Sequence, residues 1–288
     1  MFDVVLPSIL CLCTSSTLGL FLKYENKIRS AFEGEFRCRD AILAVMMIGL
    51  SVIMVAVMPE QAVIFVFVLC FGALLFKLSR VFTERLCFSI ITPALFIGLY
   101  FSSWNALFMN LFSTTAAVFS TVLLGGLFTR ETKAKPKLVP SPRHFLSGLA
   151  LYLILIVLAD ITLVFGTGFM ETAARKIAKL QLPLLVIVPT FPSMGGHAVL
   201  GLGDIFLSGL LGILTAKKMG RKPAILCILS ISATVLVGET IMLNLNTGGL
   251  PATILVAAGW SAAFGMQRLS AGLSRRSVAM SVLKREGA

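Results

Sequence analysis

The sequence predicts an all-α membrane protein, and three observations lead to this fold class. Hydrophobic residues make up 57% of the 288 residues and charged residues only 13%, which is more apolar surface than a soluble domain can bury. The apolar residues are gathered into nine runs, most of them near the length of about 20 residues that crosses a bilayer. The runs lack the strict alternation of lipid-facing strands, so helices are expected instead of a closed barrel.

The nine predicted spans fill most of the chain, with charged or turn-forming residues between them. They cover residues 4–22, 41–58, 62–76, 86–103, 106–129, 145–168, 198–216, 223–245 and 249–267. We therefore expect one transmembrane domain over 1–288, in which the first five spans (1–144) form a scaffold and the last four (145–288) carry the candidate site. The first run is kept as a span because Asp3 precedes it and Lys23 follows it, the reverse of a cleaved signal peptide.

Basic residues are distributed very unevenly between the two predicted faces. Of the 25 Lys and Arg residues, 22 lie in the tail or in loops that follow odd-numbered spans, and only Arg175, Lys176 and Lys179 lie on the opposite side. The positive-inside rule then predicts a multi-pass protein of the cell membrane with its N-terminus outside and its C-terminus in the cytoplasm. The net charge of +12 is thus explained by topology, and no nucleic-acid partner is expected because the bases form no single patch.

The segment between the sixth and seventh spans is amphipathic. Ile177 and Leu180 can share one helical face while Arg175, Lys176 and Lys179 occupy the other. This pattern predicts a helix that lies along the outer membrane interface.

Histidine and cysteine residues give no metal-binding pattern. The six cysteines include no CxxC pair, and the two histidines, His144 and His197, lie far apart in the sequence. We expect buried thiols, no metal site and no cofactor.

Acidic residues within spans are the strongest functional candidates, since each costs about 2.5 to 3.5 kcal/mol to insert at the bilayer centre. Three qualify: Asp160, Asp204 and Glu239. Asp160 lies about eight residues before the sixth span ends, and Asp204 about six residues after the seventh begins near Ala198. Because these spans are antiparallel, both carboxyls are expected roughly 10 Å below the same outer surface, which makes a facing pair plausible.

A facing pair of carboxyls suits general acid–base catalysis. Two carboxyls in a low-dielectric site share one proton, so one can take a proton from water while the other protonates a peptide carbonyl. This is the chemistry of aspartyl proteolysis. The alternative interpretation is that the two aspartates are separate structural or ion-pathway residues.

Glycines beside Asp204 favour the proteolytic interpretation. In Gly201-Leu202-Gly203-Asp204 the missing side chains leave room for a substrate backbone and allow the helix to unwind locally. A helical peptide bond is sterically shielded, so cleavage requires an extended substrate.

Several motifs resemble those of the presenilin and signal peptide peptidase family of intramembrane aspartyl proteases. Gly201 to Asp204 resembles the family's GxGD motif, and Asp160 matches its first catalytic aspartate in the sixth span. Glu171-Thr172-Ala173-Ala174 is similar to a presenilin segment, and Leu250-Pro251-Ala252 to the PAL motif that opens the ninth span. The similarity covers the last four spans. It implies a presenilin-like fold of nine spans. Because the sequence has no eukaryotic-type tails, we expect a prokaryotic homologue, of archaeal type.

The resemblance also implies roles for individual residues. Asp160 and Asp204 would be catalytic, and the residues around them would bind substrate, namely Gly201, Leu202, Gly203, Pro251, Ala252 and Thr253. Two positions depart from the family pattern, because Ala159 replaces a tyrosine and Thr253 replaces the leucine of PAL. The second departure leaves the substrate contact at Thr253 undefined.

The expected partners are transmembrane peptide substrates and the lipid bilayer, with a homo-oligomer possible. An outside N-terminus resembles signal peptide peptidase and would favour substrates such as signal-peptide remnants. The principal rival function is an ion-coupled transporter or cation leak channel that uses both aspartates as ion ligands. A second rival is a prepilin-peptidase-like enzyme, which normally has fewer spans and cuts near the cytoplasmic face.

Glu239 and His197 have no counterpart in the family motifs. Glu239 lies roughly six residues from the outer end of its span, which favours an interfacial or packing role. His197 lies about two helical turns before Asp204 and is expected to be an interfacial loop residue.

Overall fold

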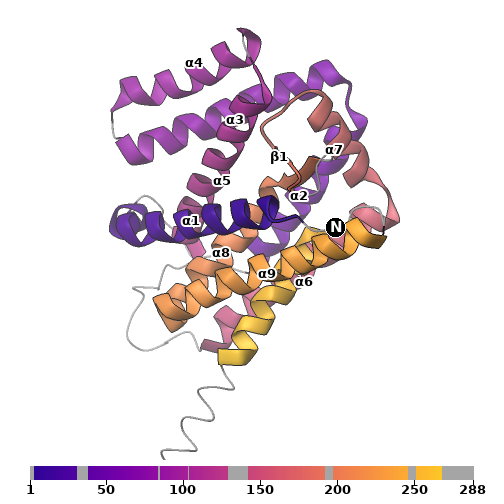
Figure 1. Ribbon diagram of the computed structural model, residues 1–288. Helices are drawn as coiled ribbons and strands as arrows, with labels where there is room; N and C mark the ends of the chain where they lie inside the picture. The colour runs from indigo at the N-terminus through magenta and orange to yellow at the C-terminus, as the bar shows by residue number, and fades with distance from the viewer. Residues whose placement is uncertain are drawn as a thin grey trace, which may run out of the picture.

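The computed structural model describes residues 3–30, 38–83, 85–102, 104–128, 142–191, 197–245 and 251–267 (Figure 1). Their helices and strands follow one another along the chain. They are α1 (Val5–Ser30), α2 (Cys38–Val57), α3 (Glu60–Thr83), α4 (Leu86–Ser102), α5 (Ala106–Phe128), α6 (Pro142–Ile161), the π-helix η1 (Thr162–Gly166), α7 (Phe169–Lys179), β1 (Leu185–Pro189), β2 (His197–Gly201), α8 (Leu202–Met219) and α9 (Arg221–Leu245). One more helix, which we call the last described helix, covers Ala252–Gln267.

The predicted all-α membrane fold is confirmed, with one short hairpin added to it. Among the described residues four helices are long and apolar enough to cross a bilayer, namely Val5–Glu25, Glu60–Thr83, Ala106–Gly126 and Arg221–Asn244. A fifth span forms if Leu151–Gly166 and Phe169–Lys179, which meet at an angle of 84°, are counted as one broken helix. Three shorter apolar helices accompany them. The count of nine spans stays a prediction.

Helix α8 lies in the middle of the bundle and packs against α1, α5 and α9 (Figure 1). Nine consecutive residues of α8, from Leu207 to Thr215, are buried. Gly209 permits the close approach, since a Cβ there would lie 2.9 Å from the Thr121 methyl of α5 and 3.1 Å from the Thr17 methyl of α1. The helix that carries Asp204 is therefore held by neighbours from both halves of the chain.

The connection from α6 to α8 departs from a simple loop. After η1, Gly168 adopts a left-handed conformation with φ of 68° as the N-cap residue that precedes α7. Glycine tolerates this conformation without a steric penalty, so the chain can turn sharply there. The amphipathic helix predicted for this segment is confirmed as α7, which ends at Lys179.

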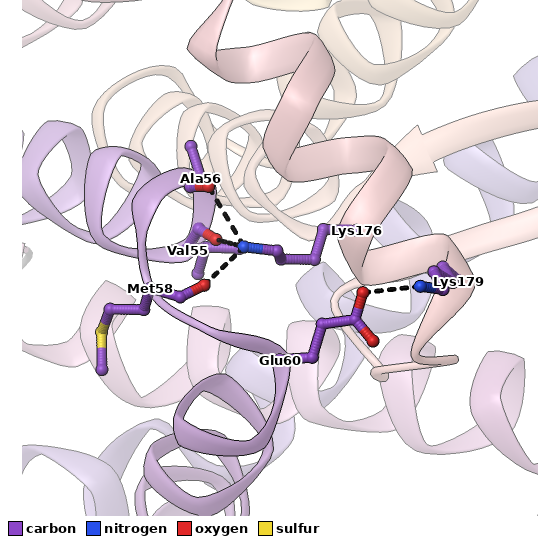
Figure 2. Close-up of polar contacts among 6 residues, drawn as sticks. All are labelled: Val55, Ala56, Met58, Glu60, Lys176 and Lys179. Atoms are coloured by element: carbon purple, nitrogen blue, oxygen red, sulfur yellow. Dashed lines mark hydrogen bonds and ion pairs between the residues drawn. The ribbon is translucent and has the colours of Figure 1, made fainter.

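Lys176 is not part of a solvated polar face, as its position in the sequence suggested. Its ammonium group donates hydrogen bonds to the carbonyl oxygens of Val55 (3.0 Å), Ala56 (3.1 Å) and Met58 (2.6 Å) at the end of α2 (Figure 2). The last carbonyls of a helix lack partners within it, and the last turn of α2 contains no basic residue of its own. Lys176 therefore uses all three of its protons to cap another helix.

A second lysine of α7 contacts the same turn differently. Lys179 forms an ion pair of 2.6 Å with Glu60, the first residue of α3 (Figure 2). Both side chains are largely exposed, at 67% and 45%, and exposed ion pairs contribute little to stability. The two lysines thus provide a matched comparison on one helix.

We expect Lys176→Met to lower the free energy of unfolding by about 2 kcal/mol, because it leaves partly buried helix carbonyls without donors. Lys179→Met removes the same charge from the same helix and should change stability by less than about 0.5 kcal/mol. Thermal unfolding of the two variants in the same detergent measures the difference. Equal losses in both variants would contradict the capping role of Lys176.

Candidate active site

Asp160 lies in the last turn of α6, directly before the π-helix η1. Its side chain is buried, with 9% of its surface exposed. The backbone of η1 closes with a hydrogen bond of 3.1 Å from the Thr167 N–H to the Thr162 carbonyl. Short π-helical segments are frequent at functional sites, and here one begins two residues after a buried carboxyl.

Asp204 lies in the first turn of α8, nearer the start of its helix than we predicted. The expected helix began near Ala198, but residues 197–201 form strand β2 and α8 begins at Leu202. The carboxyl of Asp204 turns back to accept a hydrogen bond from the backbone N–H of Gly201, the N-cap of the helix. This is the geometry of an acidic side chain that caps its own helix.

The structure brings the two aspartates together. The carboxyl of Asp160 acts electrostatically on that of Asp204, and each lies near an end of its helix. Asp204 belongs to the central helix α8, whereas Asp160 belongs to α6, which packs against α2. The two carboxyls therefore form an interacting pair, while their equal depth in the membrane stays a prediction.

Gly201 and Gly203 surround Asp204 in different ways. A Cβ at Gly201 would lie 3.0 Å from the Oδ2 atom of Asp204, so this glycine leaves space for the carboxyl itself. Gly203 is exposed, and a Cβ there would meet nothing within 4 Å. Leu202, between them, is half-buried and donates its N–H to the Leu184 carbonyl at 3.2 Å.

Thr253 contacts Asp160 directly. Pro251 is buried just before the last described helix, Ala252 begins that helix, and Thr253 is its second residue. The Thr253 hydroxyl donates a hydrogen bond of 2.5 Å to Oδ2 of Asp160, and the Thr253 N–H donates to the same carboxyl group. The residue that departs from the PAL motif is therefore a partner of an aspartate.

The β1–β2 hairpin was not predicted. Its antiparallel register pairs Leu185 with Gly201 and Ile187 with Val199. The amide of Asn110 in α5 donates to the Ile187 carbonyl at 2.7 Å and accepts from the Ile187 N–H at 2.9 Å. Helix α5 thus covers the outer edge of β1.

The hydrogen-bond pattern shows that β2 has an outer edge, on the side opposite to β1. Because Ile187 directs its backbone groups to Asn110, its partner Val199 also directs its N–H and carbonyl away from β1. Gly201, two residues on, directs its N–H to Asp204. Among the described residues none bonds to the Val199 backbone outside the hairpin, and 49% of its surface is exposed. Within the described part of the chain, the edge of β2 that leads to Asp204 therefore has no backbone partner.

Glu239 contacts a different acid from the two aspartates. Its carboxyl in α9 interacts with that of Asp3, which is fully buried. Asp3 accepts hydrogen bonds of 3.0 Å from the N–H groups of Val5 and Phe191. The sequence did not indicate this role for Asp3. His197 was expected in a loop, but it is the first residue of β2; the surroundings of its side chain lie outside the described residues.

Among the residues that the structure describes, no three His, Cys, Asp or Glu side chains gather in a way that could hold a metal ion. The candidate site consists instead of two carboxyls, one hydroxyl and backbone groups. Such a set can move protons between a water molecule and an amide.

Comparison with known proteins identifies the segment that contains this site. Residues 144–222 match the model of the signal peptide peptidase family, while no curated protein matches the chain. The matched segment begins in α6, contains both aspartates and the hairpin, and ends in α9. The part of the chain that carries Asp160 and Asp204 is therefore similar to the signal peptide peptidase family.

Proposed function

We propose that this protein is an intramembrane aspartic endopeptidase of the GxGD type, which hydrolyses peptide bonds of membrane-spanning segments. The observation that carries the proposal is the carboxyl pair of Asp160 and Asp204, which interact although one lies near the end of α6 and the other at the start of α8. The family match over residues 144–222 supports the same activity.

The proposed reaction needs only the two carboxyls and a water molecule. One aspartate removes a proton from the water as its oxygen attacks the peptide carbonyl, and the other protonates the carbonyl oxygen. The product of this step is a tetrahedral diol that is not bonded to the enzyme. Its collapse breaks the C–N bond and returns the pair to its starting protonation.

The outer edge of β2 is the proposed docking place for the extended substrate. A strand paired with Val199 would place its next backbone groups beside Gly201 and Asp204, since successive residues advance by about 3.3 Å. The exposed Gly203 leaves space for a substrate backbone. We assign the substrate-binding role to Gly201, Leu202, Gly203, Pro251 and Ala252, and refine that of Thr253 below.

Topology and substrate class follow from the charge distribution. We propose a cell-membrane protein with an external N-terminus and a cytoplasmic C-terminus, whose substrates are single spans or signal-peptide remnants with a cytoplasmic N-terminus. Transmembrane peptides and lipid are its proposed partners, and a homo-oligomer is compatible with the proposal.

A cleavage assay tests the function directly. The purified protein, in detergent and in liposomes, is incubated with a synthetic single-span peptide, and the products are identified by mass. We expect cuts within the apolar segment that are blocked by a hydroxyl-containing transition-state analogue of aspartyl proteases. Ion flux through the same liposomes without cleavage would favour the transporter and refute the protease.

The docking edge gives a separate prediction. Val199→Pro removes an N–H that faces away from β1, so the hairpin should remain while substrate pairing loses a hydrogen bond. We expect kcat/KM to fall about tenfold, measured on the same peptide, with unchanged thermal stability. Val199→Ala, which keeps the N–H, is the control. Normal cleavage by the proline variant would show that substrate does not pair with this edge.

A further inference from the structure

The hydrogen bonds to the two catalytic carboxyls are nearly symmetric, with one exception. Each aspartate lies beside the N-terminal end of a helix, Asp160 beside the last described helix and Asp204 within α8. Each also accepts one backbone N–H bond, Asp160 from Thr253 and Asp204 from Gly201. Only Asp160 accepts a further bond from a side chain among the described residues, the 2.5 Å bond from the Thr253 hydroxyl.

The Thr253 hydroxyl lies in a buried environment, which strengthens the effect of its hydrogen bond on the Asp160 carboxyl. Thr253 is only 8% exposed, so little water can replace its bond to Asp160. Helix N-termini and backbone N–H groups favour negative charge on both acids alike, and their effects largely cancel between the two. The hydroxyl is the unmatched donor, and a hydrogen bond donated to a carboxylate favours its ionised form.

We propose that Thr253 is a positioning residue that assigns different roles to the two aspartates. It holds the negative charge on Asp160, which acts as the base, and leaves the shared proton on Asp204, which acts as the acid. This inference rests on the proposed function and deepens it, since the carboxyl pair alone would not decide which member takes the proton from water.

With these roles, every proton that is transferred in the reaction cycle is accounted for. Asp160 takes a proton from water as the C–O bond forms, while Asp204 gives its proton to the former carbonyl oxygen, which becomes the second hydroxyl of the diol. On collapse the proton of Asp160 moves to the leaving nitrogen as the C–N bond breaks. A diol hydroxyl returns its proton to Asp204, so the new carbonyl forms and Asp160 is again charged.

Substitution at Thr253 tests the positioning role. Thr253→Val keeps the shape and removes the hydroxyl, so kcat should fall about tenfold to a hundredfold, with KM changed less than threefold. Thr253→Ser restores the hydroxyl and should recover most of that loss, which a purely packing role would not predict. The control is Thr240→Val in α9, where the lost hydroxyl donates a hydrogen bond within its own helix, to the Leu236 carbonyl at 2.7 Å.

Inhibitor affinity tests the role assignment without turnover. The probe is a labelled hydroxyl-containing transition-state peptide, titrated against purified Asp204→Asn and Asp160→Asn. Asparagine at position 204 is neutral and donates a hydrogen bond, as the proposed acid does, so binding should weaken less than about tenfold. Asparagine at position 160 removes the charge that accepts the inhibitor hydroxyl, so binding should weaken a hundredfold or more.

The outcomes separate the two proposals. Equal or reversed affinities for the two variants would overturn the assignment, as would unchanged cleavage by Thr253→Val, provided that the wild-type protein cleaves. A wild-type protein that neither cleaves the peptide nor binds the inhibitor would refute the proposed function itself.

Discussion

Replacing Asp160 or Asp204 by asparagine is expected to lower kcat for peptide cleavage by about 10³-fold or more, the loss typical of removing a general acid or base. The double variant should have about the same kcat as either single variant. The two carboxyls act on one water molecule, so losing either of them already removes their joint effect. Asparagine matches aspartate in size, so the bundle should remain folded. Single-turnover rates and thermal unfolding, measured on the same preparations, test both statements.

The matched control for this experiment is Glu239→Gln. Glu239 is also a half-buried acid within an apolar helix, but its carboxyl contacts Asp3 and not the aspartate pair. We expect the glutamine variant to cleave within about threefold of the wild-type rate. Retained cleavage in both aspartate variants would eliminate the two-carboxyl mechanism, and equal losses in all three would attribute the effect to folding.

The approach of the two aspartates could be predicted because it depends on local rules. Helix length, the antiparallel order of the two segments and the cost of burying an acid together predict one depth for both carboxyls. These rules act within single helices and need no knowledge of side-chain packing. The same is true of α7, which was predicted from the spacing of its charged and apolar residues.

The start of α8 could not be predicted by the same rules. Residues Ala198 to Leu200 are apolar and continue without a break into the helix, and hydropathy does not separate a short buried strand from a helical turn. The strand exists because the chain returns to pair with β1, whose other edge is closed by Asn110, 77 residues away in sequence. The correction moves Asp204 to the first turn, where Gly201 can bond to it.

Contacts between distant segments also explain the other unpredicted residues. Lys176 caps a helix more than 100 residues earlier in the chain, and Asp3 bonds to Phe191, 188 residues later. Thr253 was expected near the substrate because of its motif, yet its hydroxyl meets Asp160, 93 residues away. The local sequence around each of these side chains does not indicate its contact, because the partner lies in a distant segment.

The second large effect is expected at Gly259, where the last described helix meets α9. A Cβ at Gly259 would lie 2.7 Å from the Ile231 Cα and 3.0 Å from the Ser230 carbonyl oxygen, and these backbone atoms cannot rotate away. The Ser230 hydroxyl also donates a hydrogen bond of 2.8 Å to the Gly259 carbonyl across this contact. The two helices are therefore packed backbone to backbone, as small residues permit in membrane bundles.

Gly259→Ala must push the last described helix away from α9, and overpacking of this kind costs about 1 to 3 kcal/mol or more. The shift would also move Thr253, six residues earlier on the same helix, so cleavage should fall with stability. Gly265→Ala is the control, because Gly265 lies on the same helix, is exposed and has nothing within 4 Å of an added Cβ. There the better helix propensity of alanine should leave the midpoint of thermal unfolding unchanged or raise it. If Gly259→Ala were as stable and as active as Gly265→Ala, the close packing that brings Thr253 to Asp160 would be refuted.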